Sequence, residues 1–129
     1  MTLLLSLLSM IFCHLIADYN LQGIMANLKQ KIWWEQKGYR GHYEKDYICA
    51  LIEHSFIWTF CVFIPVFVLI YKNVIVSNLA ILAIVFILNV AWHSYIDDLK
   101  ANKFKLNLIQ DQLAHLAQII VTWLILVVI

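Results

Sequence analysis

The sequence predicts an all-α, polytopic membrane protein: a single domain over residues 1–129, built as a bundle of four transmembrane helices. Of the 129 residues, 64% are hydrophobic and only 13% are charged, whereas a soluble domain carries about a quarter charged residues. The apolar residues also gather in four runs, near 2–19, 48–71, 77–97 and 108–129. Each run is long enough to cross a hydrocarbon core about 30 Å thick.

The loop between the first two runs contains a further predicted element. Apolar residues recur there at helical spacing and a pair of tryptophans follows: Leu21, Ile24, Met25, Leu28 and Ile32, then Trp33 and Trp34. Lysines and a glutamine occupy the other faces. This pattern predicts an amphipathic helix at the inner membrane interface, held there by an aromatic anchor.

Basic residues predict how the bundle is oriented. Five of the nine Lys and Arg lie between residues 29 and 45, three lie between 100 and 105, and only Lys72 lies in the second loop. The positive-inside rule therefore places both basic loops in the cytoplasm. We expect a multi-pass protein of the bacterial inner (plasma) membrane, with both termini on the non-cytoplasmic side.

Histidines and aspartates repeat at the predicted cytoplasmic ends of the spans. The first and third spans end in His-x-x-x-Asp, the fourth begins with Asp-x-x-x-His, and the second has a histidine at about the same depth. Residues four apart share one helix face, so each pair can aim at a single point. The predicted metal ligands are His14, Asp18, His54, His93, Asp97, Asp111 and His115.

This ligand set predicts a particular chemistry. Imidazole and carboxylate bind zinc, manganese and non-haem iron, and ionisable groups inside a membrane span mark functional sites because burying them is costly. We expect one or two divalent ions, with zinc ahead of manganese and iron. Paired metals polarise a phosphoryl oxygen and generate hydroxide near neutral pH. The resulting hypothesis is a metal-dependent hydrolase at the cytoplasmic leaflet, acting on an amphiphilic, phospholipid-like substrate.

Further residues receive roles in this hypothesis. Two carboxylates are expected to act in catalysis, two neighbouring amides to orient a ligand or water, and two lysines to meet a phosphate at the interface. The predicted catalytic residues are Asp97, Asp111, Gln22 and Gln112, and the predicted substrate-binding residues are Lys29 and Lys100.

Other functions stay open at this point. The same His/Asp layer can serve an ion or proton transporter or channel subunit, a self-satisfied polar network, or a non-enzymatic phage or bacterial membrane modulator. The outer half of each span is expected to lack polar residues, so a monomer would offer no complete path for ions. The lipid bilayer is the expected partner, no nucleic acid is expected, and homo-oligomer formation is left open.

Several of these motifs resemble a known family. The segments HLIADYNLQ (14–22), HSYIDDLK (93–100) and FKLNLIQDQLAH (104–115), with Lys29 and His54 between them, resemble the small bacterial and phage membrane family known as domain of unknown function 3307. The resemblance spans nearly the whole chain and keeps the order and spacing of the motifs. It implies a membrane protein but no particular activity. The residue types are also similar, more loosely, to those of membrane-bound metal-dependent hydrolases of the inner membrane.

Overall fold

The fold was obtained as a computed structural model that describes residues 3–38, 41, 43, 45–76 and 78–128. Over these residues the chain is helical and contains no strand. Its long elements are α1 (Leu3–Leu15), continued by the π-helical turn η1 (Ile16–Asn20), α4 (Asp46–Tyr71), α5 (Leu79–Ala101), and α6 (Leu108–Trp123), continued by η2 (Leu124–Val128). The predicted all-α fold class is confirmed.

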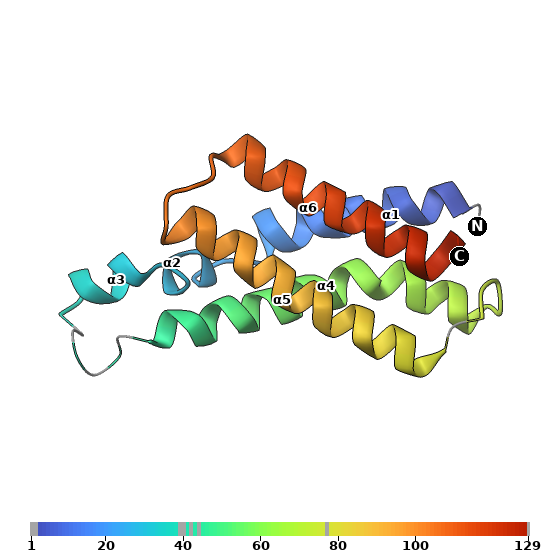
Figure 1. The fold of residues 1–129 in the computed structure, drawn as a ribbon, viewed down its shortest axis with the longest axis horizontal. Helices are drawn as coiled ribbons and strands as arrows, with labels where there is room; N and C mark the ends of the chain where they lie inside the picture. Colours follow the sequence, from blue (N-terminus) through green and yellow to red (C-terminus); the bar gives the residue numbers. More distant parts are fainter. Residues whose placement is uncertain (1–2, 39–40, 42, 44, 77, 129) are drawn as a thin grey trace.

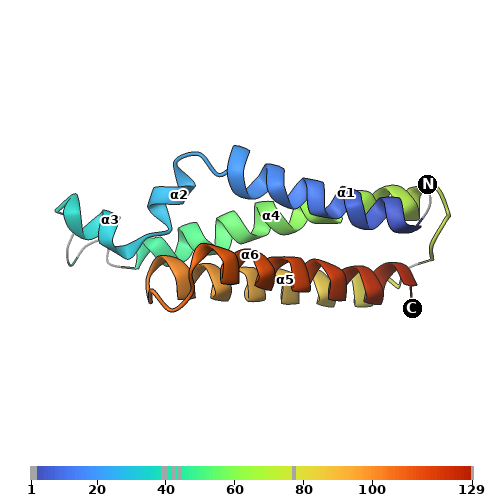
Figure 2. The same cartoon turned by 90° about the horizontal axis from the view of Figure 1, so that it is seen from above.

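The predicted spans correspond closely to the observed helices. Within the described ranges, four helical segments are long and apolar enough to cross a membrane: Leu3–Asn20, Asp46–Tyr71, Leu79–Ala101 and Leu108–Val127. Figures 1 and 2 show the four long helices running alongside one another. Both chain ends lie at one end of the bundle with the α4–α5 connection, and the α5–α6 connection lies at the other (Figure 1).

Helix α4 is the most deeply buried of the four spans. Its residues Trp58, Val62, Val66 and Leu69 are fully buried and share one face because they are three or four residues apart. Met10 of α1 and Ile119 of α6 belong to the same core. Helices α1 and α5 thus pack against α4, while α6 packs against α5 and α1.

The outward faces of the bundle are apolar. Large hydrophobic side chains such as Phe12, Phe56, Leu88 and Val121 each expose at least half of their surface. A soluble monomer rarely exposes contiguous apolar surface on this scale. Lipid chains would cover such faces without cost, which agrees with a membrane protein.

The loop after α1 differs from the prediction of one amphipathic helix. It contains two short helices, α2 (Met25–Leu28) and α3 (Lys31–Gln36), separated by Gln30 in an extended conformation with φ −98° and ψ 120°. The Asn102 side chain at the end of α5 accepts a hydrogen bond from Lys31 N (2.7 Å) and donates one to Lys29 O (3.1 Å). These tertiary bonds hold the backbone at the break, and local periodicity does not encode them.

Candidate metal centre

The predicted His/Asp pairs converge at one place in the bundle. All seven predicted ligands are buried, each with a relative exposure of 6% or less. They come from all four spans, in the half of each span nearer to the α1–α4 and α5–α6 connections. Asp18 lies in η1, a π-helical turn, and such turns often occur at functional sites. The sequence did not establish this convergence, because each helix could have been rotated to bury a different face.

One potential metal-binding group consists of Asp18, His54 and His93. The Nε2 atom of His54 lies 3.3 Å from Asp18 Oδ1 and 3.3 Å from His93 Nε2, and His93 Nε2 lies 3.8 Å from Asp18 Oδ1. Two ligand atoms of a tetrahedral zinc ion lie about 3.3–3.5 Å apart, because each is ~2.0–2.2 Å from the metal. The three donor atoms therefore have nearly the spacing of a zinc site.

A second, overlapping group consists of His93, Asp97 and His115. Oδ1 of Asp97 lies 3.4 Å from His115 Nε2 and 3.8 Å from His93 Nε2. On its other side, His115 Nε2 lies 3.4 Å from Oδ1 of Asp111. The two groups share His93, and the Asp97 carboxylate lies between them, because its Oδ2 is also 3.5 Å from His54 Nε2.

In each of the three aspartates the two carboxylate oxygens have different partners. Oδ1 faces a histidine Nε2, and Oδ2 accepts a hydrogen bond from a lysine or from Gln112. Lys29 Nζ lies 2.5 Å from Asp97 Oδ2, and Lys100 Nζ lies 2.6 Å from Asp111 Oδ2. Metal-binding carboxylates are held by hydrogen bonds to the oxygen that does not face the ion. The lysines thus orient two of the three carboxylates in this structure.

Gln112 binds the remaining outer oxygen, that of Asp18, and also that of Asp111. Its Nε2 donates to Asp111 Oδ2 at 3.1 Å and to Asp18 Oδ2 at 3.4 Å, so one amide joins carboxylates from α6 and η1. Gln22, the other predicted orienting amide, lies farther from the centre. Its Nε2 donates to the backbone oxygen of Asp18, and its buried Oε1 has no hydrogen-bond partner in the described part of the chain.

Several polar atoms at the centre lack hydrogen bonds. Within the described residues, Asp18 Oδ1, Asp111 Oδ1 and His115 Nε2 are buried and have no partner of good geometry. A buried polar atom without a partner is unfavourable by about 1–3 kcal/mol. A cation in contact with these atoms would remove that cost, so the donor set fits a metal ion.

His14 differs from the other predicted ligands. The indole Nε1 of Trp58 donates to His14 Nδ1 at 2.8 Å, and His14 Nε2 lies 3.1 Å from Gln112 Oε1. Both ring nitrogens therefore have protein partners. His14, like Asp111, belongs to neither metal-binding group. It orients Gln112, which in turn orients two carboxylates.

Trp58 is a site residue that the sequence analysis missed. Besides binding His14, its fully buried ring stacks on His93 with centroids 4.1 Å apart, and His93 stacks on His115 at 4.2 Å. Stacking fixes the planes of these two imidazoles and hence the direction of their Nε2 lone pairs. The sequence does contain a signal for this residue, because Trp58 is four residues after His54 and therefore shares its helix face.

The charges of the site are nearly balanced. Three buried aspartates contribute −3 and the lysines paired with two of them contribute +2, which leaves −1 when the histidines are neutral. Outside the spans, Lys103 binds Asp98 at 2.7 Å, and this contact raises the pKa of Lys103. Asp98 thus belongs to the interface and not to the cluster.

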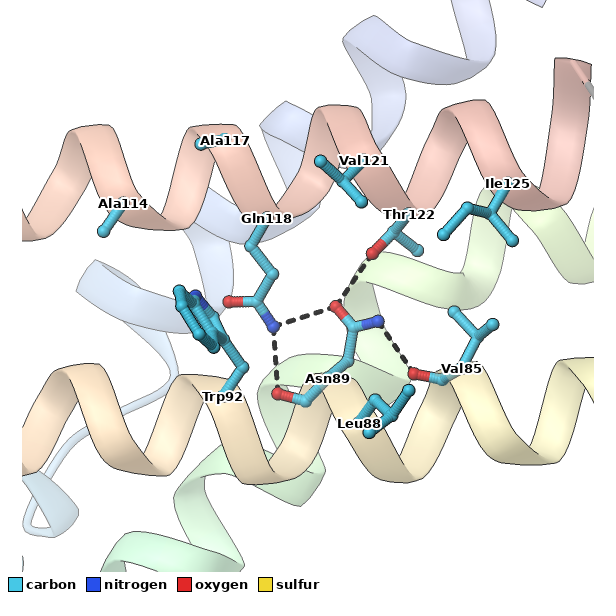
Figure 3. A pocket seen from close by; sticks show the side chains of 10 residues that line it. All are labelled: Val85, Leu88, Asn89, Trp92, Ala114, Ala117, Gln118, Val121, Thr122 and Ile125. Atoms are coloured by element: carbon cyan, nitrogen blue, oxygen red, sulfur yellow. Dashed lines mark hydrogen bonds between the residues drawn. The ribbon is translucent and has the colours of Figure 1, made fainter.

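Polar residues continue beyond the histidine layer, which corrects the expectation that the outer half of each span lacks them. Asn89 of α5 and Gln118 and Thr122 of α6 are buried and joined by hydrogen bonds (Figure 3). Asn89 lies four residues before His93, and Gln118 three residues after His115, so each shares a helix face with a histidine. The sequence analysis followed charged residues and histidines and therefore missed this cluster, although its three- and four-residue spacing from the histidines indicates it.

Comparison with known protein families, curated proteins and solved structures finds no match to this chain. The resemblance to domain of unknown function 3307 stays a prediction based on the motifs.

Proposed function

We propose that this chain is a membrane-embedded, metal-dependent hydrolase that acts on an amphiphilic, phospholipid-like substrate at the cytoplasmic leaflet of a bacterial inner membrane. The observation that carries the proposal is the set of buried histidine and aspartate atoms that face one another 3.3–3.8 Å apart. Isolated ionisable groups are costly inside a span. A divalent cation stabilises the whole set, and zinc accepts both imidazole and carboxylate ligands.

The charge of the site favours one ion over two. With a net charge of −1 on the aspartates and lysines, one divalent ion leaves +1 and a second would leave +3 in a buried environment. We assign the ion to Asp18, His54 and His93, with Asp97 beside them. A bound divalent ion would polarise a phosphoryl or carbonyl oxygen and lower the pKa of a water molecule.

This assignment leaves His115 and Asp111 as a pair that can move a proton. His115 Nε2 lies 3.4 Å from Asp111 Oδ1, and a histidine next to a carboxylate is a common general base. Lys100 lies on the solvent side of the pair, with 37% of its side chain exposed. It can exchange its carboxylate partner for an anionic head group, whereas the Lys29 side chain is only 13% exposed. Lys100 is therefore the better placed of the two predicted substrate-binding residues.

The test is elemental analysis of detergent-purified protein, followed by hydrolysis assays on vesicles of bacterial phospholipid. Wild type should retain about one equivalent of zinc, manganese or iron and release phosphate or fatty acid in a chelator-sensitive manner. His93→Ala should lose both metal and activity. Glu53→Gln is the matched control, because Glu53 is an exposed acid beside His54, and it should retain both.

Two results would overturn the proposal. Metal that stays bound in His93→Ala would show that the ion lies elsewhere. No metal in wild type, even after reloading, would favour the ion or proton pathway. One observation supports that second candidate: the polar side chains of Asn89, Gln118 and Thr122 extend the polar interior beyond the histidines.

A further inference from the structure

Both carboxylate oxygens of Asp97 face imidazole nitrogens of the metal-binding groups. Asp97 Oδ2 lies 3.5 Å from His54 Nε2, whereas Oδ1 lies 3.8 Å from His93 Nε2. His54 and His93 belong to the group that we assign to the ion, so Oδ2 is the Asp97 oxygen nearer to that group. The same Oδ2 accepts a hydrogen bond from Lys29 Nζ at 2.5 Å. Lys29 therefore holds the oxygen with which Asp97 would complete the metal site.

Lys29 and a divalent ion are thus two cations for one carboxylate oxygen. An ion bound to Oδ2 at the usual zinc–oxygen distance of ~2.0–2.2 Å would lie less than about 5 Å from the lysine ammonium, which is 2.5 Å from that oxygen. The side chains of Lys29 and Asp97 are only 13% and 4% exposed, and buried charges are screened much less than exposed ones. The repulsion between the two cations is therefore strong.

Lys29 also belongs to the segment that connects the first two spans. It directly follows α2, and its backbone oxygen accepts a hydrogen bond from Asn102 Nδ2 at 3.1 Å. The α2–α3 segment is thus bound to the end of α5 through both the side chain and the backbone of this residue. Breaking the pair of Lys29 and Asp97 removes one of these connections, so the hold on the segment depends on which cation binds Asp97.

We propose that Lys29 competes with the metal ion for Asp97, and that the α2–α3 segment thereby controls how tightly the ion is bound. While Lys29 binds Asp97, the segment is held in place and the metal affinity is low. When Lys29 withdraws, Asp97 can bind the ion. Because coupling between two sites is reciprocal, bound metal also loosens the segment. This inference rests on the metal site of the proposed function, but not on hydrolysis.

The first measurement is a zinc titration of chelator-stripped protein in detergent, with wild type beside Lys29→Met. Methionine keeps much of the apolar length of lysine without its charge. We expect Lys29→Met to bind zinc at least about tenfold more tightly, because a buried cation beside the ion is removed. If Lys29 only oriented Asp97, the same change would weaken binding by about 10–100-fold, so the sign of the effect decides between the two roles. Lys31→Met is the matched control, because Lys31 pairs with Glu35 at the surface, and it should keep the wild-type affinity.

The second measurement needs no variant. Addition of zinc to wild-type protein should make amide hydrogen exchange faster in α2 and α3, because the connection through Lys29 is lost. Unchanged or slower exchange there would overturn the inference even where Lys29→Met does not fold, and so would a Lys29→Met protein that binds zinc no more tightly than wild type. Zinc binding without hydrolysis would overturn only the proposed activity. No zinc bound by either protein would overturn both proposals.

Discussion

At the scale of single residues, His14 has both ring nitrogens engaged by neighbours. Because the Trp58 N–H donates to Nδ1, the proton of a neutral ring lies on Nε2, where Gln112 Oε1 accepts it at 3.1 Å. No lone pair is left for a metal ion. His14 therefore acts through Gln112, whose Nε2 joins Asp18 and Asp111.

His14→Gln should accordingly keep the metal stoichiometry of wild type but bind the ion about 10–100-fold more weakly, because Gln112, the outer hydrogen-bond partner of Asp18, is no longer held in place. The measurement is a metal titration of chelator-stripped protein, with His93→Ala as the variant that loses binding and Glu53→Gln as the unaffected control. A His14→Gln protein that binds no metal at all would make His14 a direct ligand.

At the scale of elements, contacts with α5 and with the residue that caps it hold the segment from α2 to α3 in place. Asn102 bonds to the backbone on both sides of Gln30, and Lys29 reaches Asp97 in the interior. Neither contact follows from helical periodicity, because the partners are about 70 residues apart in sequence. For this reason the sequence predicted one interfacial helix where the structure has two short ones.

Asn102→Ala removes both backbone hydrogen bonds, each worth about 0.5–1.5 kcal/mol. We expect amide hydrogen exchange in α2 and α3 to become about tenfold faster, while exchange in α4 is unchanged. Hydrogen-exchange mass spectrometry measures this directly. Lys105→Ala is the matched control, since Lys105 is an exposed lysine three residues farther along the chain. Unchanged exchange in the Asn102→Ala protein would mean that other contacts hold the segment.

At the scale of the whole molecule, the four spans and the His/Asp pairs on three of them follow from simple patterns. Span length and the four-residue spacing of His93 and Asp97 are local properties, so the sequence alone predicts them. The pairing of Lys29 with Asp97 and the stacking of Trp58 on His93 depend on how helices rotate against each other. Such contacts could not be predicted from one sequence.

The orientation of the bundle supplies the last prediction. The basic loops lie at one end and the chain termini at the other (Figure 1), and the positive-inside rule places the basic end in the cytoplasm. After replacement of Cys13, Cys49 and Cys61 by alanine, one new cysteine is introduced at the fully exposed Val76 or at the exposed Lys105. A membrane-impermeant maleimide should label Val76→Cys in intact spheroplasts and Lys105→Cys only after permeabilisation. The reverse pattern would contradict the predicted orientation and would place the His/Asp cluster toward the outer leaflet.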